Sequence, residues 1–118
     1  MPTKTRLAEV YLRFLQLRET IRGLPSLPPL DPLEERILLW IAKASLEQAR
    51  ISVRSMMAHD EFGSPATVHS RLKSMRRKGW IVLTATEDAR RKQIDLTHAA
   101  LLYFEQLSNC MLQAAKDS

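Results

Sequence analysis

The sequence predicts a mainly α-helical protein with one small β-hairpin. Apolar residues recur at helical spacing in several segments, whereas only one pair of short segments alternates apolar with polar residues. Glycines, prolines and capping residues mark where the helices begin and end. At 118 residues, with 45% apolar and 26% charged side chains, the chain is expected to form one globular domain.

The first predicted helix occupies residues 1–22 and is clearest over Thr3–Arg22. Its apolar residues repeat every three or four positions and form one stripe: Leu7, Val10, Phe14, Leu17 and Ile21. The stripe is too short for a free coiled coil, so it must pack on something larger. Residues 23–31 follow as a proline-rich linker that cannot continue the helix.

The predicted core, residues 32–97, opens with a helix start signal. Asp31 is the expected N-cap, Pro32 occupies the first turn, and Glu34 is placed to complete a capping box. The helix runs to about Leu46 and contains the apolar run ILLWIA, so it is expected to be largely buried. A short extended piece at Arg50–Ser52 follows.

Two further helices form a predicted helix-turn-helix. The first is brief, from Val53 to about Asp60; Gly63 then breaks the chain, and a second helix runs from Ser64-Pro65 to about Lys78. Two helices joined by a few residues around a glycine, the second of them basic, have this outline. Val68, Leu72 and Met75 are expected on the inner side of the second helix.

The segments WIVLTAT and QIDLT predict an antiparallel hairpin, with Ile81, Leu83, Ile94 and Leu96 facing inward. A hairpin directly after a helix-turn-helix makes the predicted fold a winged helix. Thr97 can cap a last helix within residues 98–118. Its apolar stripe is Ala100, Phe104, Leu107, Met111 and Ala114. We expect the two terminal helices to pair, within the chain and across a two-fold axis. The alternative is that each stripe only covers its own core.

Positive charge is concentrated in one part of the chain. The net charge is +5, yet residues 64–92 contain eight Lys/Arg against two Asp/Glu, and the other residues contain ten against eleven. All the excess charge therefore lies in one contiguous quarter, as expected when one face meets phosphates. A protein whose basic face meets an acidic protein would show the same balance.

The second helix of the pair is the predicted recognition helix. Its inward positions leave the others available to a partner, and its exposed face contains no acid, whereas solvated faces usually mix both signs. The candidate DNA-binding residues there are Ser64, Ala66, Thr67, His69, Ser70, Arg71, Lys73 and Ser74.

The hairpin sequence DARRKQIDLT resembles the wing of the MarR family of winged-helix transcriptional regulators. The exit SMRRKGWI and the opening LDPLEERILLWIA are also similar to that family, so the resemblance covers about Leu30 to Leu102. It implies that Asp88 braces Arg90, that Arg90 enters the minor groove, and that Arg91 and Lys92 lie near phosphates. The alternative is that Asp88 and Arg90 form a surface ion pair that stabilises a turn. Such a pair would be worth little energetically and would not account for three adjacent cations.

The sequence thus predicts a homodimeric, sequence-specific regulator of transcription that binds double-stranded DNA, with repression as the simplest output. The alternatives are a winged-helix module that binds proteins and a non-specific DNA-binding accessory protein. We expect no enzymatic activity, cofactor, metal site or membrane contact. A small-molecule effector is possible, but nothing in the sequence supports one. One cysteine, Cys110, and the absence of a signal peptide favour the cytoplasm.

Overall fold

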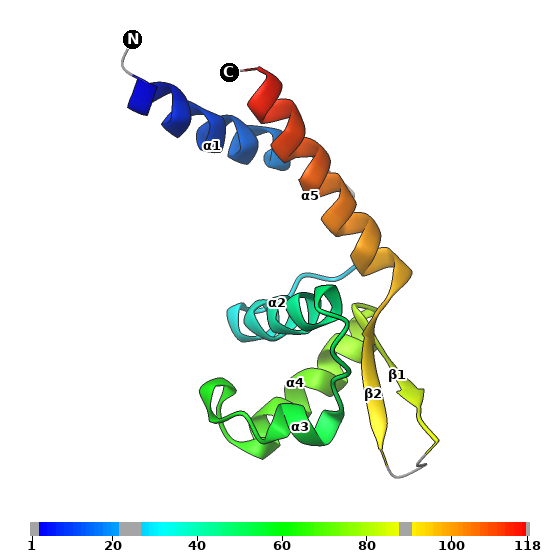
Figure 1. The fold of residues 1–118 in the computed structure, drawn as a ribbon. Coiled ribbons are helices and arrows are strands. Elements are labelled where there is room, and N and C mark those ends of the chain that lie inside the picture. Colours follow the sequence, from blue (N-terminus) through cyan, green and yellow to red (C-terminus); the bar gives the residue numbers. More distant parts are fainter. Residues whose placement is uncertain (1–2, 22–26, 88–90, 118) are drawn as a thin grey trace. The chain divides into compact units, whose positions relative to one another are not determined.

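The structure is a computed structural model that describes residues 3–21, 27–87 and 91–117. The chain divides into two compact units. The core unit is Leu27–Ala100, and the terminal unit comprises Met1–Ser26 and Leu101–Ser118. Figure 1 shows the elements of both units.

The core unit has the predicted order of elements. It contains α2 (Pro32–Leu46), α3 (Val53–Met57), a 3-10 turn (Asp60–Phe62), α4 (Pro65–Lys78), β1 (Ile81–Ala85) and β2 (Lys92–Leu96). Asp31 and Glu34 form the predicted capping box, and Ser64 caps α4 through the Thr67 N–H. Gly79 ends α4 with φ +90°, a left-handed conformation that suits glycine.

The hydrophobic centre of the core unit is built from α2, α4 and the hairpin. Its fully buried side chains include Ile37 and Ile41 of α2, Met56 of α3, and Val68 and Met75 of α4. Leu72 completes the inner stripe of α4, as predicted. The predicted mainly helical winged helix with a two-stranded antiparallel hairpin is confirmed.

The hairpin pairs Ile81 with Leu96 at its base and Ala85 with Lys92 at its far end. Ile81 and Ile94 are buried, as predicted, while Leu83 and Leu96 are half-buried. The predicted extended piece before α3 joins β2, because Ser52 bridges to Gln93 and the Ile94 N–H donates to the Ile51 carbonyl at 2.8 Å. The middle of β2 is therefore tied to the start of the helix-turn-helix.

Some element boundaries differ from the predictions. The first helix, α1 (Thr3–Glu19), ends before Arg22, and α3 ends at Met57 instead of about Asp60. His59 takes an extended conformation, and the separate 3-10 turn then buries Phe62. The half-buried Trp40 packs beside the start of this turn. Its indole ring lies edge-on against His59, the residue before the turn, with ring centroids 4.6 Å apart.

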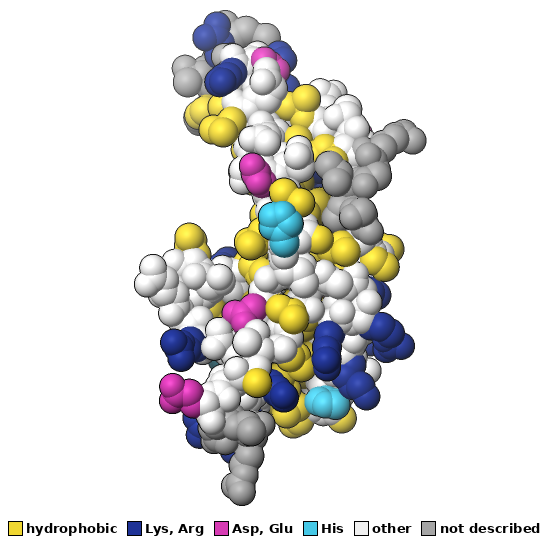
Figure 2. All heavy atoms as spheres, turned by 90° about the vertical axis from the view of Figure 1, so that its right-hand side faces the viewer, with side chains coloured by type: hydrophobic (Ala, Val, Ile, Leu, Met, Phe, Trp, Pro, Cys, Tyr) yellow, Lys and Arg dark blue, Asp and Glu magenta, His cyan; other side chains and the backbone are white. Residues whose placement is uncertain are grey.

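The terminal unit is formed by α1 and by most of α5 (His98–Lys116), which contact each other. Most residues of the predicted stripes are half-buried: Val10, Phe14, Leu17, Ile21, Phe104 and Leu107. Leu7 and Met111 are instead exposed in the single chain. Five further large apolar side chains of this unit are exposed: Tyr11, Leu12, Leu101, Leu102 and Leu112. The two helices thus leave much apolar surface open, some of it visible in Figure 2.

Candidate nucleic-acid interface

The outer face of α4 carries the exposed part of the predicted site. Ala66, Thr67, His69, Ser70 and Lys73 are all exposed, as is the N-cap Ser64. The hydroxyls of Ser64 and Thr67 lie 2.9 Å apart, so the first turn presents a hydrogen-bonded pair of small polar groups. Groups of this kind can approach base edges or phosphates closely.

Three cations cluster toward the C-terminal end of the same helix. Lys73, Arg76 and Arg77 line a shallow hollow of about 460 Å³. Arg76 and Arg77 were not among the predicted site residues, although their place in the acid-free RRK run could have indicated them. Lys and Arg side chains gather along one edge of the core unit in Figure 2. Such an edge can hold a polyanion.

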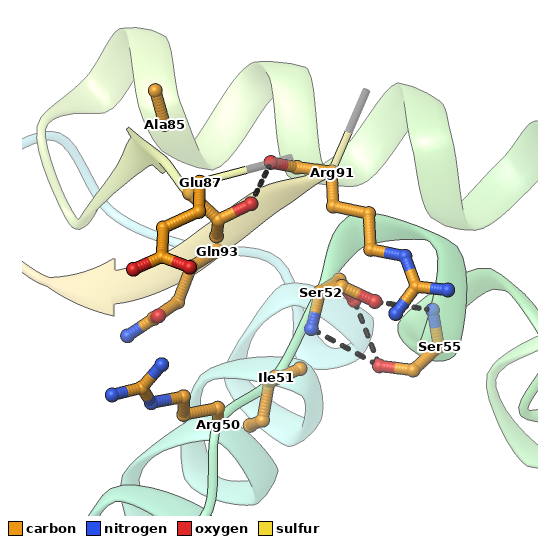
Figure 3. Close-up of a pocket in the computed structure, with 9 residues that line it drawn as sticks. Arg50, Ile51, Ser52, Ser55, Ala85, Glu87, Arg91 and Gln93 are labelled. Atoms are coloured by element: carbon orange, nitrogen blue, oxygen red, sulfur yellow. Dashed lines mark hydrogen bonds between the residues drawn. The ribbon is translucent and has the colours of Figure 1, made fainter. Parts of the chain in front are cut away.

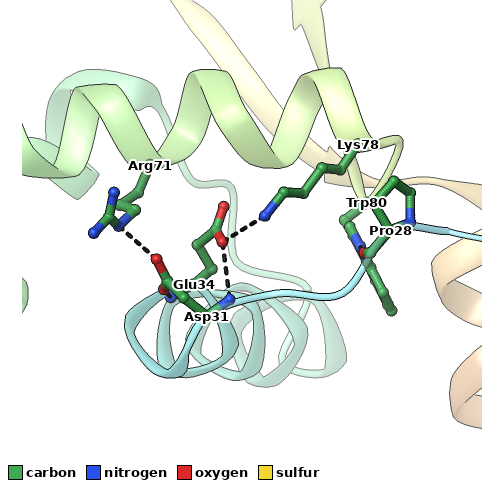
Figure 4. Close-up of polar contacts among 6 residues, drawn as sticks. All are labelled: Pro28, Asp31, Glu34, Arg71, Lys78 and Trp80. Atoms are coloured by element: carbon green, nitrogen blue, oxygen red, sulfur yellow. Dashed lines mark hydrogen bonds and ion pairs between the residues drawn. The ribbon is translucent and has the colours of Figure 1, made fainter.

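Two predicted recognition residues are turned toward α2 instead. Arg71 and Ser74 are half-buried, and the Arg71 Nε lies 2.9 Å from the Asp31 Oδ2 (Figure 4). The other Asp31 oxygen, Oδ1, accepts the Glu34 N–H at 2.8 Å. Asp31 therefore caps α2 and holds Arg71 of α4 at the same time.

Glu34 is the buried acid of this polar contact, with its side chain 2% exposed. Its Oε1 accepts hydrogen bonds from the Lys78 ammonium at 2.8 Å and from the Asp31 N–H at 2.9 Å. Burial raises the pKa of Glu34, but the Asp31 N–H, the Lys78 ammonium and the Ser74 hydroxyl together outweigh it and hold the pKa below its usual value. Glu34 is thus a carboxylate that fixes α4 on α2.

The wing supplies the remaining predicted residues. Asp88 and Arg90 lie outside the described residues, while Arg91 and Lys92 are exposed where β2 begins. The Thr86 hydroxyl donates to the Arg91 carbonyl at 3.0 Å, which closes the described part of the hairpin. The wing cations and the outer face of α4 both belong to the core unit.

Thr97, directly after β2, joins the end of α4 to the start of α5 at the base of the wing. Its hydroxyl donates to the Gly79 carbonyl at 2.7 Å and accepts the Ala100 N–H at 3.1 Å. The same side chain therefore holds the end of α4 and caps the first turn of α5, as predicted for its capping role. Trp80 lies beside this junction, with its Nε1–H donating to the Pro28 carbonyl at 2.8 Å (Figure 4).

A pocket of about 740 Å³ lies between the wing and the start of α3 (Figure 3). It is lined by Arg50, Ile51, Ser52, Ser55, Ala85, Thr86, Glu87, Arg91 and Gln93. Only Arg91 among these was a predicted site residue. Sequence reasoning missed the others because the pocket forms when segments about forty residues apart meet.

Across the part of the chain that the structure describes, no three His, Cys, Asp or Glu residues are grouped to hold a metal ion. None of the described helices is both long and apolar enough to cross a bilayer.

Comparisons with known proteins bear on the fold. No family model matches the chain, and no curated protein matches it in sequence. The structure matches the crystal structure of a mutant form of MepR, a MarR-family regulator, from a multidrug-resistant S. aureus clinical isolate. The match has a TM-score of 0.56 and 15% identity, and covers 99% of this chain and 80% of that one. The fold implied by the resemblance to the MarR family is thus confirmed: the protein has the MarR-like winged-helix fold.

Proposed function

We propose that the protein is a transcriptional regulator that binds double-stranded DNA in a sequence-specific manner and acts as a homodimer in the cytoplasm. Repression by occupying the promoter is the simplest output. The observation that carries the proposal is the outer face of α4, where small polar groups precede Lys73, Arg76 and Arg77 and no acid occurs. A winged helix offers such a helix to the major groove.

In the proposed complex, α4 of each protomer enters a major groove and each wing reaches the neighbouring minor groove. Thr67, His69 and Ser70 would face base edges, and Lys73, Arg76 and Arg77 would contact phosphates. Arg71 and Ser74 would support the helix from behind, because both contact the start of α2. Arg90, with Asp88 as its brace, is retained as the minor-groove residue on the strength of the family resemblance.

Dimerisation is assigned to the terminal helices, and DNA binding to residues 32–97. The support is the exposed apolar surface of the terminal unit, which includes Leu7, Met111 and Leu112. A monomer rarely leaves so many large apolar side chains open on two adjoining helices. A two-fold dimer would cover them and present two recognition helices to a pseudo-palindromic operator.

The proposal is tested by selecting bound sequences from random duplex DNA. We expect a pseudo-palindromic site that binds on the order of 10³-fold more tightly than random duplex. Equal binding to selected and scrambled duplexes would favour a non-specific accessory protein. If no duplex binds, the basic face belongs to a protein-interaction module.

Replacing Arg90 with alanine is expected to weaken binding to the selected site and to flatten its salt dependence. In each protomer, the loss of one cation that neutralises a DNA phosphate is expected to reduce the steepness of log K against log salt by about 0.9. Fluorescence anisotropy over a range of salt concentrations measures both effects. Lys43→Ala is the control, since Lys43 is an exposed cation on α2, a helix that carries none of the proposed DNA-binding residues. An affinity and slope equal to those of the control would remove Arg90 from the interface.

A further inference from the structure

The pocket between the far half of the wing and the start of α3 has the chemistry of a polyanion site. We propose that it holds a stretch of DNA phosphodiester backbone between Arg50 and Arg91, and that Glu87 weakens this contact by its opposing charge. The inference rests on the proposed function, because it adds a second place where the same protein holds DNA.

The lining of the pocket excludes a drug-like apolar ligand. Of its nine residues only Ile51 and Ala85 are apolar, and Ile51 is buried, with its carbonyl already accepting the Ile94 N–H. Pockets for small organic molecules are mostly walled by hydrophobic and aromatic side chains. Here six of the nine side chains carry guanidinium, hydroxyl or amide groups and Glu87 carries a carboxylate, which suits a hydrated partner with phosphate groups.

The two guanidinium groups lie toward different ends of the pocket. In Figure 3 the Arg91 guanidinium lies over the start of α3, near Ser55, whereas the Arg50 guanidinium lies on the side of Gln93 and Glu87. Both arginines are exposed. A compact ion would contact one of them, but an extended chain of phosphates can contact both. Guanidinium also matches the geometry of phosphate oxygens better than ammonium does.

The floor of the pocket is held in shape by the protein itself. Ser52 and Ser55 form a reciprocal capping box, with N–H to Oγ distances of 3.0 and 3.1 Å, and the Ser55 hydroxyl donates to the Ser52 carbonyl at 2.9 Å. Ser52 is also bridged to Gln93 of β2. These serines therefore fix the spacing between α3 and the wing, and a pre-formed groove costs less to order on binding.

Glu87 is the acidic residue of the pocket and is exposed. Its carboxylate lies on the same side of the pocket as Arg50 in Figure 3, so a phosphate that approaches Arg50 meets a negative charge nearby. Neutralising this charge should strengthen DNA binding, which a residue with a purely structural role in the turn would not do.

The test compares Arg50→Gln, Glu87→Gln and Lys43→Gln for binding to the duplex selected above. Arg50→Gln is expected to bind roughly tenfold more weakly and with a slope of log K against log salt lower by about 0.9 per protomer. Glu87→Gln is expected to bind about two- to fivefold more tightly. Lys43→Gln, which changes net charge as Arg50→Gln does but outside the pocket, should match the wild type. Arg50→Lys keeps the charge without the planar group and should fall between Arg50→Gln and the wild type.

The proposal is wrong if Arg50→Gln behaves like Lys43→Gln, or if Glu87→Gln binds more weakly, while the wild type binds its site. If the wild type binds no duplex, the proposed function itself fails. A titration with inorganic phosphate, followed through the backbone NMR signals of Ser52 and Ser55, distinguishes the source of the anion. Saturable binding of phosphate alone at low millimolar concentration would mean that the pocket is a site for a free anion and not for the DNA backbone. No saturation is expected.

Discussion

Replacing Leu7 and Leu112 with glutamate is expected to convert the proposed dimer into monomers and to weaken binding to the proposed operator by about 10²- to 10⁴-fold. The two side chains are 68% and 63% exposed in the single chain, so the substitutions should hardly disturb the protomer itself. In the proposed dimer they lie in a covered apolar surface, where added negative charges would be desolvated and would repel each other. The loss of affinity follows because a monomer reaches only one half-site.

The matched control for this pair is Leu46→Glu. Leu46 is 85% exposed and belongs to α2 of the core unit, so the variant adds the same kind of charge away from the terminal helices. Sedimentation equilibrium of all variants measures the oligomeric state, and anisotropy with the selected duplex measures affinity. A Leu7→Glu/Leu112→Glu protein that remains a dimer would show that another surface joins the protomers.

Replacing Lys78 with methionine is expected to lower the free energy of unfolding by about 2 kcal/mol at neutral pH, because it removes a charged hydrogen-bond donor. Glu34 would then be a buried carboxylate without its ammonium partner. Methionine is nearly as good a helix former as lysine, so helix propensity changes little. Lys73→Met on the exposed face of the same helix is the control and should stay close to the wild type. Urea unfolding followed by circular dichroism measures the difference.

The pH dependence identifies the cause of that loss. The pKa of Glu34 in the folded protein is lowered, so its stabilising contribution is fully present above the unfolded pKa of about 4.3 and is lost as the pH falls through the folded pKa. The difference in free energy of unfolding between Lys78→Met and the wild type should therefore become smaller as the pH falls from the unfolded pKa of Glu34 toward its folded pKa. The double variant Glu34→Gln/Lys78→Met should lose less stability than the sum of the losses of the two single variants, since no unpaired buried charge remains in it. A deficit that is constant with pH would mean that Lys78 acts through its apolar stem alone.

Features set by neighbouring residues could be predicted from the sequence. The start of α2 follows from Asp31, Pro32 and Glu34, whose capping box closes within one turn. The inner stripe of α4 follows from apolar spacing, since Val68, Leu72 and Met75 recur every three or four residues and all three are buried. The register of the wing also agrees with its alternating pattern.

Polar contacts over long sequence distances could not be predicted in the same way. Apolar periodicity assigns every polar residue of α4 to the outside, but Arg71 and Ser74 face α2 because Asp31 and Glu34 lie there to receive them. Arg50 appeared only as part of a short extended piece, yet backbone pairing of that piece with β2 brings it beside the wing. Both cases depend on segments that meet only when the chain folds.

The two sides of α4 have separate tasks, and this bears on how the protein can evolve. One side of α4 holds the helix in place through buried or ion-paired side chains: Val68, Arg71, Leu72, Ser74, Met75 and Lys78. The other side is exposed and carries Ala66, Thr67, His69, Ser70, Lys73, Arg76 and Arg77. Substitutions on the open side remove few contacts within the fold and so cost little stability. If α4 reads DNA as proposed, a lineage of such proteins can acquire new operator preferences by drift on one side of this helix, while the opposite side keeps the scaffold intact.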